Sequence, residues 1–520
     1  MPNQSHTQPT NLGDLVRDLA AIHSEHPAVV GEHAALTFAE LDRSAGQWAR
    51  AFIAAGFGIG SHIGLLAGNG PDWLAAAFGV WRAGATLVPL STFVTAHELG
   101  EILAHADVDA LVVQPELRSH DYLAMLTRLS LPRRLRATIV LSDATPSYQS
   151  AAEFLASAAS DANPDVIQPE SIACILYTSG TTGQPKGVQL SHRAILSTVV
   201  PTAARTGLSA DDALLSTLPL FWVAGLVIRA LPTLATGCAL HLVETFTVES
   251  VLAALERHRI TAVHWRPPQV GEVLAHPRFD PRLLAHVHRG GGRTEWFADT
   301  LATDARFITG FGMTEMAGYV TALSVDDPPE ARRAQLGQTL PGVALRIVDA
   351  DGQQVPRGDI GEVYVRGPGL FSGYYRQPAS TGLSHDGWFV TGDLGRVDEN
   401  GVFHFVGRSK DLLRVKGINV SPVEVEGVLS AHPDVEAVYV IGLPPDGLEQ
   451  RLVAAIVAKR GDVGDLEAQL RTLASDTLSH YKRPEHYVFI ARDDVPLGGT
   501  SKPQRAALAE MVGRRLDVTD

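Results

Sequence analysis

The beginning of the chain alternates between amphipathic segments with helical spacing and short apolar runs that are typical of buried strands. Strands that alternate with helices indicate βαβ units, in which helices cover both faces of a largely parallel sheet. After a polar, Ala/Ser-rich bridge over residues 142–169, a second α/β repeat is predicted over 172–288. In the first repeat the helical segments are 12–22, 36–55, 73–83 and 98–105, and the apolar runs are 62–66, 85–89 and 110–113.

The pattern changes after residue 342. Residues 343–406 contain short β-rich pieces separated by Gly/Pro turns, which predicts a small barrel-like subdomain. The predicted fold class is therefore α/β: a large N-terminal domain (1–409) of two doubly wound subdomains plus this small β-barrel-like subdomain, and a smaller α+β C-terminal domain (410–520). In the C-terminal domain, helices are predicted over 422–430 and 465–478, and strands over 437–441, 452–458 and 486–490.

The composition is that of a globular protein with more than one domain. The chain has 520 residues, too many for one ordinary core, and 45% of them are hydrophobic. The net charge of −14, without a compensating basic tract, disfavours nucleic acid or an anionic membrane as a partner. Cys174 and Cys238 lie in apolar surroundings and are expected to be free core thiols in a reducing compartment. We expect a cytoplasmic location, because we find neither a signal-peptide pattern nor the ~18 apolar residues of a membrane span.

Residues 177–187, YTSGTTGQPKG, form the most informative stretch. Glycines let the backbone curl so that successive N–H groups point inward, and small hydroxyl side chains add donors, so this nest suits phosphate oxygens. Lys186 can add a point charge for the same anion. The stretch is not a Walker loop, and a flexible linker is disfavoured because a predicted strand precedes it and a helical pattern follows. The nest residues are Thr178, Ser179, Gly180, Thr181, Thr182 and Gly183.

Further segments with candidate chemistry follow downstream. Residues 289–294 contain three glycines after a predicted strand end at 285–288, and they permit a flat ring to approach the backbone, although a bare tight turn is the alternative. In Gly310–Glu315, GFGMTE, an aromatic ring between glycines can stack on adenine, and the carboxylate can bind Mg²⁺; a buried aromatic in a turn is the alternative. Asp393 follows a predicted Thr-Gly turn, where its carboxylate can accept both hydroxyls of a ribose.

In this order the segments resemble those of the adenylate-forming superfamily, which includes acyl-CoA synthetases, peptide-synthetase adenylation domains and beetle luciferases. The motifs match across residues 177–502, and the N-terminal part agrees in pattern. The resemblance implies that ATP and Mg²⁺ activate a small carboxylic acid as an adenylate, and that coenzyme A then displaces AMP. Besides the nest and Lys186, the nucleotide-binding residues it implies are Gly291, Gly292, Arg293, Phe311, Gly312, Met313, Thr314, Asp393 and Arg408.

The resemblance also implies a mobile C-terminal domain. Lys410 matches the hinge about which this domain swings between the two half-reactions, and Gly417 lies in the loop that then approaches pantetheine. Lys502, in the loop 496–505, matches the lysine that bridges the carboxylate and the α-phosphate, where an ammonium offsets developing charge. The catalytic residues implied are Lys502, Thr182, Glu315 and Lys410, with Glu315 as the metal ligand.

The chain departs from the family pattern at two positions. Ser501 stands where glycine normally precedes the lysine, and Trp222 stands where many acyl- and aryl-CoA ligases have histidine. Trp222 either shapes the acid pocket or is a packing residue, and Arg266 is either a counter-charge or a solvated residue after a strand. The predicted pocket is mostly apolar and favours a bulky hydrophobic or aromatic acid; its residues are Trp222, Val223, Gly290, Gly310 and Ala317.

These features favour an ATP-dependent acid–CoA ligase, and several alternatives stay open. One is an adenylation protein that loads an acyl carrier protein; an α-amino acid substrate is disfavoured, because such members usually have an aspartate near Phe221. Another is a partial enzyme, disabled by Ser501 and Trp222, that only converts a supplied adenylate to a thioester. A luciferase-like oxygenase is compatible with the fold, but nothing in the sequence favours it.

Overall fold

In the computed structural model the chain forms two compact units. The first consists of residues 1–345 and 365–389, and the second of 346–364 and 390–520. Lys410, the predicted boundary between domains, lies outside the described residues, so a division at that position stays a prediction. The structure describes residues 9–142, 147–157, 166–178, 186–302, 304–334, 336–409, 412–415, 418–443, 450–459, 464–497 and 503–517.

One sheet of the first unit, the β3 sheet, has the strand order β11-β10-β4-β3-β5-β8-β9 within the described residues. Its neighbouring strands are parallel except for β10 and β11, which form an antiparallel hairpin. The strands predicted over 62–66 and 110–113 are confirmed residue for residue. The sheet consists of β11 (Lys186–Ser191), β10 (Ile172–Thr178), β4 (Thr86–Pro89), β3 (His62–Leu66), β5 (Ala110–Val113), β8 (Ala137–Val140) and β9 (Gln149–Ser150).

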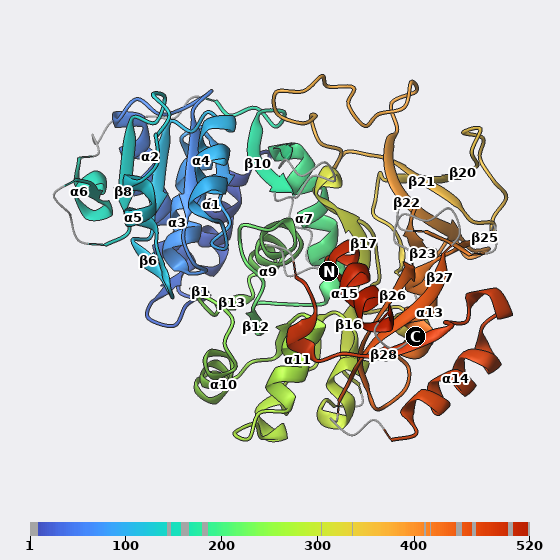
Figure 1. The fold of residues 1–520 in the computed structure, drawn as a ribbon. Helices are drawn as coiled ribbons and strands as arrows, with labels where there is room; N and C mark the ends of the chain where they lie inside the picture. Colours follow the sequence, from blue (N-terminus) through green and yellow to red (C-terminus); the bar gives the residue numbers. More distant parts are fainter. Residues whose placement is uncertain are drawn as a thin grey trace. The chain divides into compact units, whose positions relative to one another are not determined.

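Helices pack against the β3 sheet and against one another (Figure 1). Helix α2 (Phe38–Ala54) begins at a capping box in which the Thr37 side chain and Glu40 satisfy each other's backbone N–H groups. Helix α3 (Pro71–Arg82) contacts β3 and β4, and the indole of Trp81 donates to the carbonyl of Ala173 in β10 at 3.0 Å. The other helices here are α1 (Leu12–His23), α4 (Ala96–His105), α5 (Tyr122–Thr127) and α6 (Ala151–Ala156), with a small hairpin of β6 (Glu116–Leu117) and β7 (His120–Asp121).

The place of β10 corrects the predicted organisation. The sequence predicts this strand as the start of the second α/β repeat, but Cys174 pairs with Leu87 of β4 in the β3 sheet. The hydroxyl of Thr86 also donates to the carbonyl of Ile172 at 3.0 Å. An apolar run predicts a strand, whereas side-chain packing decides which strands become its neighbours.

The second sheet of this unit, the β12 sheet, has the order β16-β15-β14-β12-β13-β1-β2 within the described residues. It is parallel apart from its edge strand β2, so the predicted α/β class is confirmed. Helices α10 (Val248–Arg257) and α11 (Pro267–Leu274) cover it through a core of aliphatic side chains, Trp265, Phe297 and Phe307. Its strands are β16 (Arg306–Ile308), β15 (Arg289–Gly291), β14 (Ala262–His264), β12 (Ala213–Ser216), β13 (Ala239–Leu242), β1 (Pro27–Val30) and β2 (Ala35–Thr37).

Further helices of the first unit follow β11 in the chain, and some of them contact strands of the β12 sheet. A π-helical turn, η1 (Leu226–Ala230), continues directly from the short helix α8 (Val223–Gly225). After β16, the last strand of the β12 sheet in the chain, comes a small antiparallel sheet of β17 (Gly310–Met313), β18 (Gly318–Ala322) and β19 (Gln338–Thr339). The remaining helices of the first unit are α7 (His192–Thr206), α9 (Leu231–Ala235), α10 (Val248–Arg257), α11 (Pro267–Leu274), η2 (Pro281–Leu284), η3 (Thr294–Thr300), η4 (Thr314–Met316) and α12 (Pro329–Ala334).

The segment predicted as a barrel-like subdomain forms a four-stranded sheet in the order β20-β21-β22-β23, most of whose described residues belong to the second unit. The strand predicted over 344–348 is confirmed as β20. A short hairpin of β24 and β25 follows it in the chain. These strands are β20 (Ala344–Val348), β21 (Gly361–Arg366), β22 (Phe389–Val397), β23 (Phe403–Arg408), β24 (Leu413–Val415) and β25 (Ile418–Val420).

The end of the chain forms a three-stranded sheet, β26-β27-β28, with helices on both faces. Side chains alternate along β27: Leu452, Ala454 and Ile456 enter one core with α13 and α14, and Val453 and Ala455 enter another with α15. The sequence predicts five of the elements in this part of the chain, but not helix α15 or the short 3-10 turns η6 and η7. The elements are α13 (Pro422–Leu429), β26 (Val435–Leu443), β27 (Arg451–Ala458), α14 (Leu466–Thr477), η6 (His480–Lys482), β28 (His486–Phe489), η7 (Arg492–Asp494) and α15 (Arg505–Asp517).

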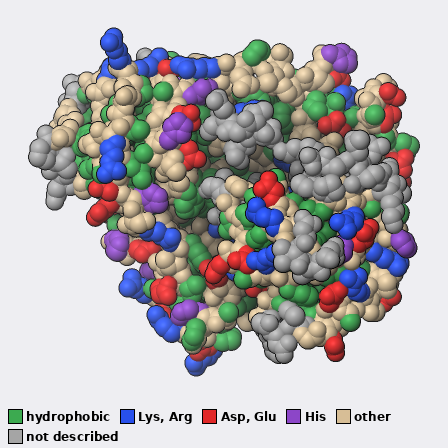
Figure 2. Space-filling model, viewed as in Figure 1, with side chains coloured by type: hydrophobic (Ala, Val, Ile, Leu, Met, Phe, Trp, Pro, Cys, Tyr) green, Lys and Arg blue, Asp and Glu red, His purple; other side chains and the backbone are tan. Residues whose placement is uncertain are grey.

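The surface and the helices bear on possible partners. On the face shown in Figure 2, basic and acidic side chains are interspersed among those drawn in colour. Among the described residues, no helix has the length and apolar character needed to cross a membrane. Both cysteines are free and buried, as predicted.

Candidate active site

Strands β10 and β11 form the stem of the predicted phosphate loop. Thr178, the last residue of β10, pairs with Lys186, the first residue of β11, so the stem closes directly below the loop. The predicted nest residues Ser179, Gly180, Thr181, Thr182 and Gly183 lie outside the described residues. The structure therefore places the two ends of the loop, and the phosphate-binding role of the nest stays a prediction.

Lys186 and Glu315 both contact a tyrosine, Tyr374, that is not among the predicted site residues. The ammonium of Lys186 lies 5.0 Å from the centre of the Tyr374 ring, and the Tyr374 hydroxyl donates to Glu315 Oε1 at 2.8 Å. The backbone N–H of Phe371 donates to the carbonyl of Glu315 at 2.8 Å. Burial, together with the nearby Glu315 carboxylate, raises the pKa of Tyr374, which keeps the phenol neutral. The structure thus brings together the predicted phosphate lysine and the predicted metal ligand through Tyr374.

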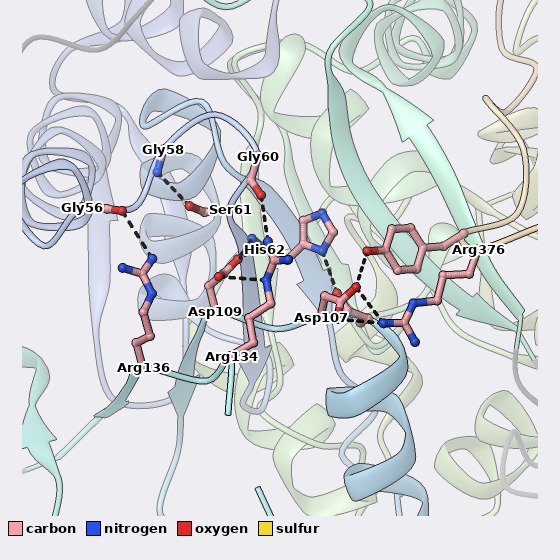
Figure 3. Close-up of polar contacts among 12 residues, drawn as sticks. Gly56, Gly58, Gly60, Ser61, His62, Asp107, Asp109, Arg134, Arg136 and Arg376 are labelled. Carbon is pink, nitrogen blue, oxygen red and sulfur yellow. Dashed lines mark hydrogen bonds and ion pairs between the residues drawn. The ribbon is translucent and has the colours of Figure 1, made fainter. Parts of the chain in front are cut away.

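A polar network that includes Tyr375, Asp107 and Arg376 holds strand β11 of the stem. The backbone N–H of Tyr375 donates to the carbonyl of Gly187 in β11 at 2.7 Å, and its hydroxyl donates to Asp107 at 2.8 Å. Asp107 also pairs with Arg376 at 2.8 Å, as Figure 3 shows. Burial would raise the pKa of Asp107, but hydrogen bonds from Tyr375 and Arg376 outweigh it and lower the pKa below its ordinary value. Asp107 and Arg376 both have left-handed backbone conformations, φ 50° and 59°, which residues other than glycine seldom adopt.

Two neighbours extend this network. The ring of His105 shares a 2.7 Å hydrogen bond with the hydroxyl of Tyr177, the first residue of the predicted phosphate loop. Burial, and then the charge of Arg376, lower the pKa of His105, so it is a neutral partner. Two residues after Asp107 in the chain, Asp109 binds Arg134 at 3.0 Å and accepts the backbone N–H of His62 at 2.9 Å (Figure 3). The stem therefore rests on paired polar groups.

The glycine-rich segment is positioned differently from its prediction. The sequence predicts a strand end at 285–288, with a tight turn at the glycines as one alternative, but Gly290 and Gly291 belong to strand β15. A Cβ atom at Gly290 would lie 2.6 Å from the Phe307 ring and from the Val263 carbonyl, so close strand packing requires a glycine there. Gly292 follows with φ 103°, and Arg293 is the N-cap of η3. The predicted contact of this segment with adenine stays a prediction.

Residues 310–317 also form regular structure. Gly310, Phe311, Gly312 and Met313 make up β17, whereas Thr314 and Glu315 begin the single turn η4, and Ala317 ends it with a left-handed φ of 51°. The Phe311 side chain is 8% exposed. It therefore lies in a strand and not in the turn of the alternative interpretation, and its stacking on adenine stays a prediction.

Trp222 belongs to an aromatic cluster at the start of α8. Its ring centre lies 5.7 Å from that of Phe221 and 6.3 Å from that of Phe93, and the guanidinium of Arg266 lies 5.7 Å above it. Trp222 and its neighbour Val223 are only partly buried. Arg266 is thus half-buried against an indole instead of fully solvated, and burial lowers its pKa.

In the second unit, Asp393 and Arg408 are brought together. They are cross-strand partners in β22 and β23, and Arg408 Nε lies 2.9 Å from Asp393 Oδ1. Asp393 is 2% exposed, and its backbone N–H donates to the Thr391 hydroxyl at 3.0 Å. The sequence predicts a Thr-Gly turn before Asp393, but the strand runs through all three residues, with Gly392 at φ 70°. The structure places the two predicted nucleotide-binding residues side by side, and their binding to ribose stays a prediction.

Comparison with known proteins identifies the family. A family model described as "AMP-binding enzyme" matches residues 16–375, and one described as "AMP-binding enzyme C-terminal domain" matches residues 424–502. The chain belongs to the AMP-binding enzyme family. The predicted resemblance to the adenylate-forming superfamily is therefore confirmed.

Relatives along nearly the whole chain are acid–CoA ligases. Feruloyl-CoA synthase of an Amycolatopsis species is 33% identical over 485 residues, which cover 90% of this chain and 92% of the relative. Indoleacetate–CoA ligase of Aromatoleum aromaticum is 31% identical and covers 92% and 94% of the two chains. Among solved structures, ATP-bound MatB from Rhodopseudomonas palustris has a TM-score of 0.81 at 28% identity, over 96% of this chain and 99% of the other.

This AMP-binding enzyme is an acyl-CoA synthetase that uses ATP to join a carboxylic acid to a thiol through an adenylate. The anthranilate CoA ligase AuaEII with anthranoyl-AMP supports the fold alone, with a TM-score of 0.86 at 24% identity over 98% and 99% of the chains. Three predicted site residues, Lys410, Gly417 and Lys502, lie outside the described residues, so their roles stay predictions.

Proposed function

We propose that this acyl-CoA synthetase activates a bulky hydrophobic or aromatic carboxylic acid and transfers it to coenzyme A. The aromatic cluster of Phe93, Phe221 and Trp222 carries this proposal, because a pocket beside such rings buries a large apolar acid and leaves acetate poorly held. Relatives named for feruloyl and indoleacetate groups support an aromatic acid.

The reaction then proceeds by two displacements. A carboxylate oxygen attacks the α-phosphorus of ATP, the bond from that phosphorus to the bridging oxygen breaks, and pyrophosphate leaves. The sulfur of coenzyme A next attacks the acyl carbon, and AMP leaves with the electron pair of the broken carbon–oxygen bond. Positioning and charge neutralisation are the main tasks of the protein in such a reaction. In this proposal Lys186 holds phosphate oxygens, and Lys502 neutralises the charge that develops at the α-phosphate.

Glu315 fits the role of a Mg²⁺ ligand. Its carboxylate accepts a hydrogen bond from the neutral phenol of Tyr374, which orients an oxygen ligand without cancelling its charge. Mg²⁺ is commonly held by one or two carboxylates together with substrate phosphates, so a single protein carboxylate suffices. The bound ion would neutralise charge on the phosphates of ATP.

A second candidate is an enzyme that runs only the thioester step on a supplied adenylate. Trp222 favours it, because an indole replaces the histidine of many related ligases and packs with Phe221. Ser501 beside Lys502 points the same way. Coenzyme A is favoured over a carrier protein as acceptor, because the relatives are named as CoA ligases.

Pyrophosphate release distinguishes the candidates. We would measure it with Mg·ATP and a panel of hydrophobic, aromatic and short-chain acids, with and without coenzyme A. Turnover of large acids that becomes catalytic only with coenzyme A would support the ligase. Faster turnover of acetate or propionate would refute the proposed substrate class. No pyrophosphate release with any acid, while synthetic acyl-adenylates are still converted to thioesters, would support the partial enzyme.

A further inference from the structure

Arg229 in the π-helical turn η1 is a buried cation with unmet hydrogen-bonding capacity. Its side chain is 1% exposed, yet Nε and Nη2 have no hydrogen-bond partner among the described residues. These two nitrogens share one edge of the guanidinium, the edge that grips a carboxylate through two parallel hydrogen bonds. π-Helical turns are rare and are frequently found at functional sites.

Two titratable side chains near Arg229, those of Tyr319 and His264, are neutral. Tyr319 in β18 shares a hydrogen bond with the guanidinium, and burial raises the pKa of its phenol. His264 at the end of β14 has a buried Nδ1 without a described partner, and burial, followed by the charge of Arg229, lowers its pKa well below the ordinary value. Among the described residues, no carboxylate is found to influence Arg229.

A second buried arginine shows how a structural one is satisfied. Arg82 Nε donates to the carbonyl of Gly13 at 2.9 Å, Nη1 donates to the carbonyl of Asp42 at 2.8 Å, and Nη2 pairs with the Asp42 carboxylate. Arg82 therefore has both a counter-ion and an acceptor for each of its three side-chain nitrogens. Arg229 has neither among the described residues, which is the state expected of a residue whose anionic partner is a ligand.

The position of Arg229 is that of a ligand site. His264 and Gly291 are paired neighbours at the carboxyl ends of parallel strands, where α/β sheets bind their ligands. A Cβ atom at Gly291 would lie 2.6 Å from both Arg229 Nη2 and His264 Nδ1, so any larger residue would collide with the guanidinium edge. The turn η1 continues from the helix that begins at Trp222, and Gly291 adjoins Gly290, so Arg229 lies beside the predicted acid pocket.

We propose that Arg229 is a specificity-determining residue that binds a second carboxylate of the substrate through Nε and Nη2, with Tyr319 and His264 beside it. This inference rests on the proposed function and narrows it to acids that carry a carboxylate distant from the one that is activated. Pairing such a group with a buried guanidinium discriminates strongly, because an acid without it leaves the cation unpaired.

The test compares matched acids on matched variants. Pyrophosphate release is measured with benzoate against isophthalate and terephthalate, phenylacetate against 1,3-phenylenediacetate, and hexanoate against adipate. The enzymes are wild type, Arg229→Met, Arg229→Lys and the control Arg266→Met, which removes a nearby charge. We expect wild type to prefer at least one diacid about tenfold. Arg229→Met should lower kcat/KM for that diacid about 100-fold, mainly through KM, and change the monoacid less than threefold.

Three outcomes would overturn the inference. Wild type could prefer every monoacid, Arg229→Met could leave the diacid unaffected, or Arg266→Met could cause the same loss. Failure of the proposed function has a different signature, because wild type would then release pyrophosphate with neither kind of acid. In that case the thermal shift on binding is the test. The diacid, and not its matched monoacid, should raise the Tm of wild type and leave the Tm of Arg229→Met unchanged. An unchanged Tm in both enzymes would refute the role of Arg229.

Discussion

The hydrogen bond from Tyr374 to Glu315 can be removed without disturbing its surroundings. Tyr374→Phe deletes one oxygen and keeps the ring that lies 5.0 Å from Lys186. The lost bond is 2.8 Å long and has an ionised acceptor, and such bonds contribute about 1.5–3 kcal/mol. At 1.4 kcal/mol per tenfold, the productive orientation of Glu315 should become rarer by a factor of about 10 to 150.

The assay is pyrophosphate release at saturating ATP and acid over a titration of Mg²⁺. If Glu315 is the metal ligand, Tyr374→Phe should raise the Mg²⁺ concentration for half-maximal rate by at least about tenfold. Tyr122→Phe is the matched control, because the Tyr122 hydroxyl is also buried and donates to the carbonyl of Thr92 at 2.8 Å, far from Glu315 in the sequence. It should lose about 1 kcal/mol of unfolding free energy and keep the wild-type Mg²⁺ dependence. Identical Mg²⁺ curves for the two variants would refute the role given to the Tyr374–Glu315 pair.

Three further predictions use other parts of the chain. Lys502→Ala should abolish pyrophosphate release but keep thioester formation from a supplied acyl-adenylate; equal loss of both rates would disprove its assigned role. Burial lowers the pKa of His192 to about 4 from an ordinary 6.5. Between pH 6.5 and pH 4 only the unfolded state therefore gains a proton at this residue, so the unfolding free energy decreases as the pH falls through this range. In urea titrations, His192→Gln should therefore lose about 1.6 kcal/mol less unfolding free energy than wild type between pH 6.5 and pH 5, and equal losses in the two proteins would contradict this. Asp107→Asn keeps a residue that tolerates a positive φ but removes the pair with Arg376, so unfolding free energy should fall by about 0.5–1 kcal/mol and the KM for ATP should rise; wild-type values would argue against the stem network.

The elements that the sequence predicts well are those with a strong local pattern. Strands β3, β5 and β20 have the predicted bounds, because short apolar or alternating runs between turn residues leave little ambiguity. Helix α15 was missed, since its apolar face is narrow: only Leu508, Ala509 and Val512 of its described side chains are buried, and Met511 and Leu516 are partly buried. Sheet partners also escaped prediction, because the position of β10 depends on contacts with residues about 90 positions away, such as Trp81.

The predicted site divides in the same way. Motifs with distinctive spacing pointed to Lys186, Glu315, Asp393 and Arg408, and the structure pairs the last two across adjacent strands. Tyr374 was missed because a tyrosine after glycine has no distinctive local signal, although it contacts both Lys186 and Glu315.

Arg229 was missed although a lone charge inside the apolar run Leu226–Leu231 was visible in the sequence. A buried cation with unmet donors costs stability, and replacement of such groups by apolar side chains of similar volume is often neutral or stabilising by 1–4 kcal/mol. Arg229→Met should therefore keep or raise the unfolding free energy in the absence of substrate. The hydrogen bond that Tyr319 loses would reduce this gain by about 1 kcal/mol. Arg82→Met should instead lose about 3–5 kcal/mol, because it leaves the Asp42 carboxylate without its partner. Equal losses in the two variants would mean that Arg229 is as well satisfied by the protein as Arg82, and the case for a substrate carboxylate at Arg229 would be refuted. A stabilised Arg229→Met enzyme that no longer turns over a diacid would show that the chain retains this charge for its substrate at a cost in stability.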